Sequence, residues 1–169
     1  LLLAEKILDS RKYNEELKDV TWETCTLRAW LNDEFINTVF DETAIARIPA
    51  TKLVNADNAQ YGTLGGNDTE DKVFLLSFDD VSNPAYGFHS DSLEKDTARR
   101  ATGTAFAQNN GIVISDQAPY SGNSIWWLRS PGTYQTDAFC VSVEGEANNH
   151  NFNADEAGIG VRPAIWVVL

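Results

Sequence analysis

The segment that sets the expected architecture spans residues 126–132 and is Trp126-Trp127-Leu128-Arg129-Ser130-Pro131-Gly132. Two tryptophans and a leucine in succession predict a compact strand from Trp126 to Arg129, because short apolar runs bounded by turn residues are typical of buried strands. The Ser-Pro-Gly that follows predicts a turn. We therefore expect Trp126 and Trp127 to be scaffold residues and Arg129 to lie where the strand meets a loop.

The residues after this turn continue the strand pattern. Residues 138–143 alternate between two faces and predict a second strand, and Glu144-Gly145 predicts a hairpin turn. A run rich in β-branched residues at 161–168 predicts the last strand, in which Pro163 indicates an edge position or a strand start. Trp166 belongs to this strand, and we assign it to the scaffold.

Arg162 occupies a position like that of Arg129. Each follows an apolar strand segment and precedes a turn or a proline. An arginine at such a junction can pair with a carboxylate or bind backbone carbonyls through its five N–H donors. We expect structural roles for both side chains, and anion binding is the alternative.

The N-terminal part has a different pattern. The apolar residues from Leu1 to Leu8 predict a buried strand. Thr24 is the expected N-cap of a helix, and apolar residues at spacings of three and four from Leu27 to Phe40 form one helical stripe. Asn32-Asp33 is where this stripe would divide into two helices, and Asp41 would cap a third.

The middle of the chain alternates short elements with loops. The loop at 56–70 is long for a compact domain, and loops of this length are often functional. The other expected elements are a strand at 51–55, a buried strand at 73–76, a helix at 78–81 capped by Ser77, and a helix at 98–109. Helices first and antiparallel strands last, without repeats or a linker, predict a single α+β domain over residues 1–169.

Composition narrows the function classes. The chain has 169 residues with 25 acidic and 13 basic side chains, hence a formal charge of −12. This acidity argues against a nucleic-acid partner, which needs clustered Lys and Arg, and against a basic membrane-surface helix. No apolar run reaches the ~18 residues that a membrane span requires. The chain has no Met, from which we expect a processed domain trimmed at its N-terminus.

Catalytic and metal-binding signatures are missing from the sequence. GxSxG, HExxH, a P-loop and GxGxxG do not occur. We expect His89 at the surface and His150 in a binding face. Cys25 and Cys140 lie far apart in sequence, so a bridge and two free buried thiols are both open. A zinc site needs three or four such ligands, so we predict neither a metal nor a cofactor.

The polar segment 146–157 places oxygen-bearing side chains at alternate positions, namely Asn149, Asn151, Asn153 and Asp155. In an extended segment they would share one side, and oxygen ligands suit calcium. The glycine and the final glutamate of an EF-hand loop are absent from their places. The other interpretations are a solvated hydrogen-bonding face and a ligand-contact face.

Several motifs in a fixed order carry a family resemblance. They are Trp22-Glu23-Thr24, Leu27-Arg28 and Trp30-Leu31-Asn32, then Asp71 to Ser77, Trp126 to Gly132, and Gly160 to Trp166. The chain resembles a bacterial domain family of unknown function with the pattern TWETSxLRxWLN … DKVFLLS … WWLRSPG … GVRPALW. The resemblance covers nearly the whole chain. In that family a strand-rich stretch precedes the opening Leu run, which agrees with a trimmed N-terminus.

The C-terminal motifs also resemble the C-type-lectin-like fold of formylglycine-generating enzymes and of the variable proteins of diversity-generating retroelements. In those proteins a late Trp-Leu-Arg-Ser strand and a final Gly-Val-Arg-Pro strand frame a ligand-facing segment. The resemblance implies an exposed recognition surface at 132–137 and 146–155. Its expected ligand-contact residues are Tyr134, Asp137, Asn148, Asn149, His150, Asn151, Phe152, Asn153 and Asp155. The Asn-rich segment fits a variable protein, because adenine-targeted mutagenesis acts on Asn codons.

The chain lacks the catalytic and calcium-binding residues of two groups of proteins with the C-type-lectin-like fold. Formylglycine-generating enzymes use two closely spaced late cysteines, whereas Cys140 is alone in that region, so their oxidase chemistry is not supported. Sugar-binding C-type lectins hold calcium with Glu-Pro-Asn or Gln-Pro-Asp and a Trp-Asn-Asp triplet, and none of these occurs here.

We therefore expect a non-catalytic ligand-recognition module in a secreted or cell-surface protein. The expected partner is a protein or glycan on a cell or phage surface, without membrane insertion by this domain. The alternatives are an enzyme of the formylglycine-generating type and a structural or assembly domain of a surface protein.

Overall fold

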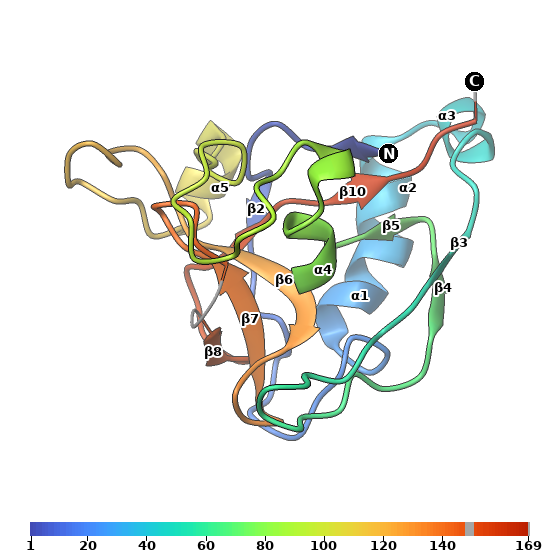
Figure 1. Cartoon of the computed structure of the whole chain (residues 1–169). Helices are drawn as coiled ribbons and strands as arrows, with labels where there is room; N and C mark the ends of the chain where they lie inside the picture. Colours follow the sequence, from blue (N-terminus) through green and yellow to red (C-terminus); the bar gives the residue numbers. More distant parts are fainter. Residues whose placement is uncertain (148–150, 169) are drawn as a thin grey trace.

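Helices and strands occupy different parts of the chain. The computed structural model describes residues 1–147 and 151–168. The longest helical segment lies in the first half, and most strands of the largest sheet come from the C-terminal third. Figure 1 shows this helical rod packed beside the strands. The arrangement confirms the predicted α+β class.

Three sheets organise the strands. The strand bounds are β1 (Leu2–Leu3), β2 (Asp9–Ser10), β3 (Thr51–Leu53), β4 (Thr69–Asp71), β5 (Val73–Phe74), β6 (Trp126–Pro131), β7 (Asp137–Val141), β8 (Asn151–Asn153), β9 (Gly160–Val161) and β10 (Ala164–Ile165). The largest sheet has the order β2-β9-β6-β7-β8, a second has the order β1-β10-β5, and β3 pairs with β4. The pairs are antiparallel, except that β6 and β9 run parallel.

The two terminal strand predictions were too long. The segment 1–8 contains only β1, and Ile7 forms an isolated bridge with Gly103. The chain then enters a different sheet at β2. The segment 161–168 divides at Pro163, because proline has no N–H for a sheet ladder, and β10 begins at the next residue. The prediction that Pro163 marks a strand start is confirmed.

The first helical stripe forms one rod of α1 (Thr26–Trp30), a π-helical turn (Leu31–Phe35) and α2 (Ile36–Val39). Its N-cap is Cys25, not Thr24, because the Cys25 sulfur accepts from the N–H of Arg28. Asn32 does not break the rod, since its side chain donates to the Val73 carbonyl at 2.8 Å and accepts from the Lys72 N–H at 2.9 Å.

Side-chain caps explain the short helices. Asp41 caps α3 (Glu42–Ala46), and Ser77 caps α4 (Phe78–Val81), both as predicted. A 3₁₀ turn follows at Pro84–Tyr86. The helix predicted at 98–109 is only α5 (Ala105–Asn109), capped by Thr104. Residues before it are not helical because their carbonyls serve other elements. For example, the Arg99 carbonyl accepts from the Trp126 indole at 3.0 Å.

Three fully buried tryptophans hold the core together. Trp22 donates its indole N–H to Asp71 at 2.9 Å, and Trp127 donates to the Arg11 carbonyl at 2.8 Å. Each of the three tryptophans, Trp126 included, therefore hydrogen-bonds to a segment distant in sequence. The same bond gives its buried indole N–H a partner. Trp166 is partly buried and packs against this core.

The strand β6 continues farther than predicted, through Ser130 and Pro131, and Pro131 pairs with Ala138 across an irregular register. The following strand, β7, spans 137–141 instead of 138–143, and all its residues are buried. The turn expected at Glu144-Gly145 is present, with the Gly145 N–H donating to the Ser142 carbonyl. Within the described residues, no helix has the length and apolar character needed to cross a membrane.

Candidate functional site

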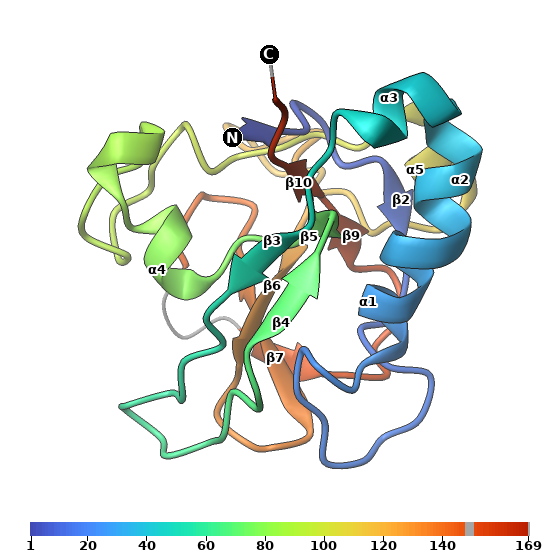
Figure 2. The ribbon, with the colours of Figure 1, turned by 90° about the vertical axis from the view of Figure 1, so that its right-hand side faces the viewer.

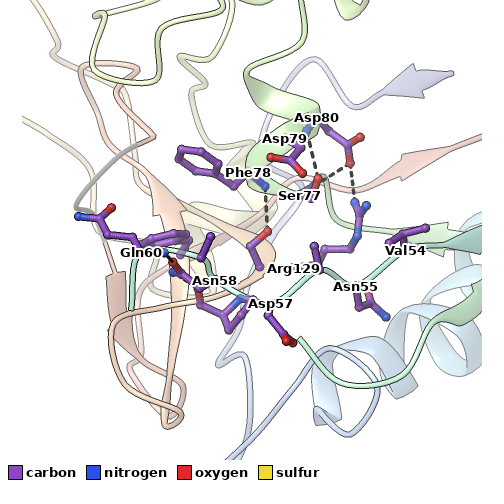
Figure 3. A pocket seen from close by; sticks show the side chains of 15 residues that line it. Val54, Asn55, Asp57, Asn58, Gln60, Ser77, Phe78, Asp79, Asp80 and Arg129 are labelled. Carbon is purple, nitrogen blue, oxygen red and sulfur yellow. Dashed lines mark hydrogen bonds and ion pairs between the residues drawn. The ribbon is translucent and has the colours of Figure 1, made fainter. Parts of the chain in front are cut away.

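A pocket of about 600 Å³ opens between the loop after β3, the start of α4 and the β6–β7 pair. We call it the Arg129 pocket. Its lining residues are Val54, Asn55, Ala56, Asp57, Asn58, Ala59, Gln60, Ser77, Phe78, Asp79, Asp80, Arg129, Ser130, Pro131 and Phe139. Figure 3 shows the loop at 54–60 on one side and the first turn of α4 on the other. Segments distant in sequence therefore meet at one site.

Asn58 fixes the loop wall of the pocket. Its amide donates to the Pro131 carbonyl at 3.0 Å and to the Gly132 carbonyl at 3.3 Å. Its side-chain oxygen accepts from the Gln60 N–H at 3.1 Å, a local turn that asparagine favours. One side chain thus shapes the loop and attaches it to the end of β6.

The opposite wall is fixed by a capping box. The Ser77 hydroxyl accepts from the Asp80 N–H at 3.0 Å, and the Asp80 carboxylate accepts from the Ser77 N–H at 2.8 Å. Ser130 of β6 accepts from the Phe78 N–H at 2.9 Å. The first turn of α4 is therefore attached directly to β6 (Figure 3).

Arg129 lies at the base of the site and is 7% exposed. Its guanidinium donates to the Leu75 carbonyl at 2.9 Å and pairs with Asp80 at 2.5 Å. Among the residues that the structure describes, its buried Nε atom has no hydrogen-bond partner. An unpaired buried donor costs free energy, so an arginine with a purely structural role is expected to have partners for all its buried N–H groups. Arg129 does not meet this expectation.

The pocket combines an apolar floor with an excess of negative charge. Phe78 and Phe139 form a tilted ring pair with centroids 5.6 Å apart. Asp80 is neutralised by Arg129, whereas Asp57 and Asp79 are further carboxylates on the same lining. In the described part of the chain the Asp79 carboxylate has no hydrogen bond or ion pair. The site therefore favours a neutral or cationic group over an anion.

A family model described as a domain of unknown function, DUF6273, matches residues 1–169. The chain belongs to the DUF6273 family. No curated protein matches it, and no solved structure matches it. The match spans both the Arg129 pocket and the surface expected from the C-terminal motifs.

That second surface of the DUF6273 domain is only partly a free face. Tyr134 is 69% exposed and Asn153 is exposed, whereas Asp137 is buried. Asn151 donates to Asp137 at 2.8 Å and accepts from Thr133 at 2.9 Å, so its side chain is engaged within the domain.

The other expected contact residues have mixed positions. Phe152 and Asp155 are partly buried, while Asn148, Asn149 and His150 lie outside the described residues. Residues 1–147 and 151–168 contain no group of three or more His, Cys, Asp or Glu that could hold a metal.

Arg162 and the cysteines have structural surroundings in this DUF6273 domain. Arg162 donates to the Ala4 carbonyl at 2.9 Å and to the Arg99 carbonyl at 3.1 Å, and burial lowers its pKa to about 10. Cys25 and Cys140 are both free and buried. Burial raises the pKa of the Cys25 thiol to about 12 and that of Cys140 well above its ordinary value.

His89 also serves the fold of its own loop. It is exposed, as expected, and its Nδ1 atom accepts from the Asp91 N–H at 3.0 Å. This contact makes the ring part of a local turn.

The sequence indicates several parts of the pocket but not the site as a whole. It predicts a long loop of a kind that is often functional, Ser77 as a helix cap, and Arg129 where a strand meets a loop. The missing link was Asn58, whose partners lie more than seventy residues later in the chain. An asparagine in a loop carries no local signal for such a contact.

Proposed function

We propose that this DUF6273 domain is a non-catalytic recognition module that binds its ligand in the Arg129 pocket. The supporting observation is the pocket itself, because both walls are attached to β6 by hydrogen bonds before any ligand arrives. Its size of about 600 Å³ lies within the range of ligand sites. Preformed walls reduce the entropy lost on binding.

We infer that the scaffold is C-type-lectin-like. In support, β6 and β9, which carry the framing motifs, pair directly through Trp126 and Gly160. The β7–β8 pair comes from the segment between them. This is the arrangement that the resemblance implies. The exposed Tyr134 and Asn153 then offer a second surface, where sequence variation of the retroelement type would act.

We expect the partner to be a protein or glycan at a cell or phage surface, and the parent protein to be secreted or surface-bound. The formal charge of −12 supports a partner that is not a nucleic acid. The enzyme alternative of the formylglycine-generating type gains no support, because copper loading needs closely placed thiolates and both buried thiols have raised pKa values.

The proposal is tested by filling the pocket. Ala59 lines it and is exposed, so Ala59→Trp places a bulky ring in the site without disturbing the core. The wild-type chain is first screened on glycan and linear-peptide arrays. Binding to the hits should fall at least ~10-fold in Ala59→Trp, since steric exclusion removes most of the contact.

Ala46→Trp is the matched control, because Ala46 is exposed at the end of α3 and does not line the pocket. It should leave binding unchanged. Retention of full binding by Ala59→Trp, or the absence of any hit on either array, would refute the pocket as the recognition site.

A further inference from the structure

The Arg129 pocket continues into a second hollow along the edge of β3. This hollow, of about 350 Å³, is lined by Thr51 to Val54 together with Asp80, Tyr86, Arg129 and Trp166, among others. Both hollows share Val54, Asp80 and Arg129. The two hollows therefore adjoin each other, and we call them together the β3 groove. Figure 2 shows β3 with β4 on one side and α4 across from its other side.

The edge of β3 that faces this groove is unpaired. Within the described residues β3 pairs only with β4, in the register Thr51↔Asp71, Lys52↔Glu70 and Leu53↔Thr69. Hydrogen-bonded and non-hydrogen-bonded pairs alternate along an antiparallel ladder. A ladder bonded through its middle pair would also need bonds between residues 50 and 72 and between residues 54 and 68, and the described residues form neither. The end pairs therefore carry the bonds, and Lys52 points its N–H and C=O away from β4. Val54 lies just beyond β3, and continuing the alternation to it turns its N–H and C=O the same way.

Outside the β3–β4 ladder, no residue in the described part of the chain supplies a backbone partner for these groups. The groups are spaced for a strand, since alternate residues of a strand point the same way and are roughly 6.6 Å apart. An unpaired edge is a template for another extended backbone. A peptide in this position would satisfy both residues at once.

The lining beside this edge selects among peptides. Phe78 and Phe139 give the Arg129 pocket an apolar floor, and Tyr86 and Trp166 line the adjoining hollow. Asp79 adds negative charge that Arg129 does not neutralise, whereas the Asp57 carboxylate accepts from the Gly65 N–H at 2.9 Å. Side chains of a bound strand that point into the groove therefore meet both apolar surface and carboxylates.

We propose that the β3 groove binds an extended peptide segment of a partner protein as an added strand on β3. The segment carries at least one Lys or Arg, whose charge is placed beside Asp79. Main-chain hydrogen bonds to Lys52 and Val54 hold the segment, and the groove selects alternate side chains. This inference rests on the proposed function and gives its ligand a chemical class. A glycan lacks the regular N–H and C=O spacing that a strand edge presents.

The test uses the full chain and synthetic peptides. The probe is a library of linear hexapeptides, acetylated and amidated at their ends, with one fixed Lys. Binders are ranked by titration calorimetry, and each backbone N–H of the best binder is then N-methylated in turn. Methylation of the residues that pair with β3 should weaken binding at least ~10-fold, because it removes a donor and adds a clash. Methylation of the alternating residues should change binding less than ~2-fold.

Two protein variants separate charge from pairing. Asp79→Asn should weaken the Lys-containing binder several-fold and reduce its salt dependence. Asp33→Asn is the matched control, because Asp33 is an exposed acid on the helical rod. An alternating methylation pattern together with loss in Asp79→Asn supports the inference.

The outcomes separate this inference from the proposed function. If Ala59→Trp abolishes peptide binding but methylation has no alternating effect, the pocket stands and strand pairing is wrong. If only glycans bind, and Ala59→Trp removes that binding, the recognition function stands and the peptide assignment is overturned. If no library member binds at millimolar concentration, the peptide assignment is also overturned.

Discussion

Arg99 and Arg129 are both buried arginines, yet their surroundings differ. Arg99 is fully buried, and every nitrogen of its guanidinium donates to backbone carbonyls. The carbonyls belong to Val81, His89, Asp91, Ser92, Glu94 and Gly145. We call this set the Arg99 cage. It ties the loop after α4 to the turn after β7.

Arg129, in contrast, has one carbonyl and one carboxylate as side-chain partners, and its Nε lacks a partner among the described residues. The Arg99 cage has no donor left for a ligand, whereas the Arg129 pocket combines an incompletely satisfied arginine with open volume. Burial alone therefore does not identify a functional arginine. The number of satisfied donors, together with adjacent space, is the better criterion.

The largest expected effect comes from emptying the Arg99 cage. Arg99→Ala leaves several buried carbonyls without donors and should lower the free energy of unfolding by about 3 kcal/mol or more, since each unsatisfied group costs about 1–3 kcal/mol. Urea denaturation followed by circular dichroism measures this loss. Arg100→Ala is the control, because Arg100 is partly exposed and donates to two carbonyls. A loss below ~1 kcal/mol in Arg99→Ala would contradict the structural role of the cage.

Chemical labelling of the two cysteines measures how readily the domain opens in the absence of denaturant. Because both thiols are buried with raised pKa values, a thiol reagent at pH 8 should label them only after the domain opens. Arg99→Ala should accelerate labelling of Cys25 and Cys140. Equal labelling rates in wild type and Arg99→Ala would show that the cage does not restrain the fold.

Arg129→Lys tests the other side of the comparison. Lysine keeps the charge beside Asp80 but lacks the planar fork that also reaches the Leu75 carbonyl. We expect a stability loss of about 1–2 kcal/mol and a loss of at least ~10-fold in affinity for array hits. Calorimetry and urea denaturation measure the two quantities separately. Full affinity with reduced stability would assign Arg129 to the scaffold alone, as the sequence first indicated.

Local patterns predicted the elements whose determinants are local. Ser77 and Asp41 cap helices that begin at the next residue, and the apolar run at Trp126 forms a buried strand. The helix predicted at 98–109 does not form around Arg99, where the contacts are distant in sequence. The Arg99 side chain donates to the carbonyls of the cage, and the Arg99 carbonyl accepts from Trp126.

Contacts between distant residues also explain why the sequence does not reveal the Arg129 pocket. The Arg129 pocket depends on Asn58 and Ser130, which hydrogen-bond to residues more than fifty positions away. The C-terminal motifs indicate instead the surface that includes Asn153. Hydrogen bonds between distant loops have no periodic signature, so a sequence shows the candidates but not their partners.

A smaller effect is expected from the loop anchor. Asn58→Ala removes the hydrogen bonds to the carbonyls of Pro131 and Gly132 and should lower stability by about 1 kcal/mol. Affinity for pocket ligands should fall, because the freed loop must be ordered again on binding. Hydrogen exchange of residues 56–62 measures the loosening directly. Unchanged exchange there would show that other contacts hold this wall.

The smallest effect is expected on the surface first suggested by the sequence. Tyr134 and Asn153 are exposed, so Tyr134→Ala and Asn153→Ala should each change stability by less than about 0.5 kcal/mol. Their effect on binding decides between the two surfaces. If the ligand occupies only the Arg129 pocket, both variants bind array hits as wild type does. If affinity falls in these variants but not in Ala59→Trp, recognition takes place on the β8 face, and the Arg129 pocket belongs to the scaffold despite its unsatisfied arginine.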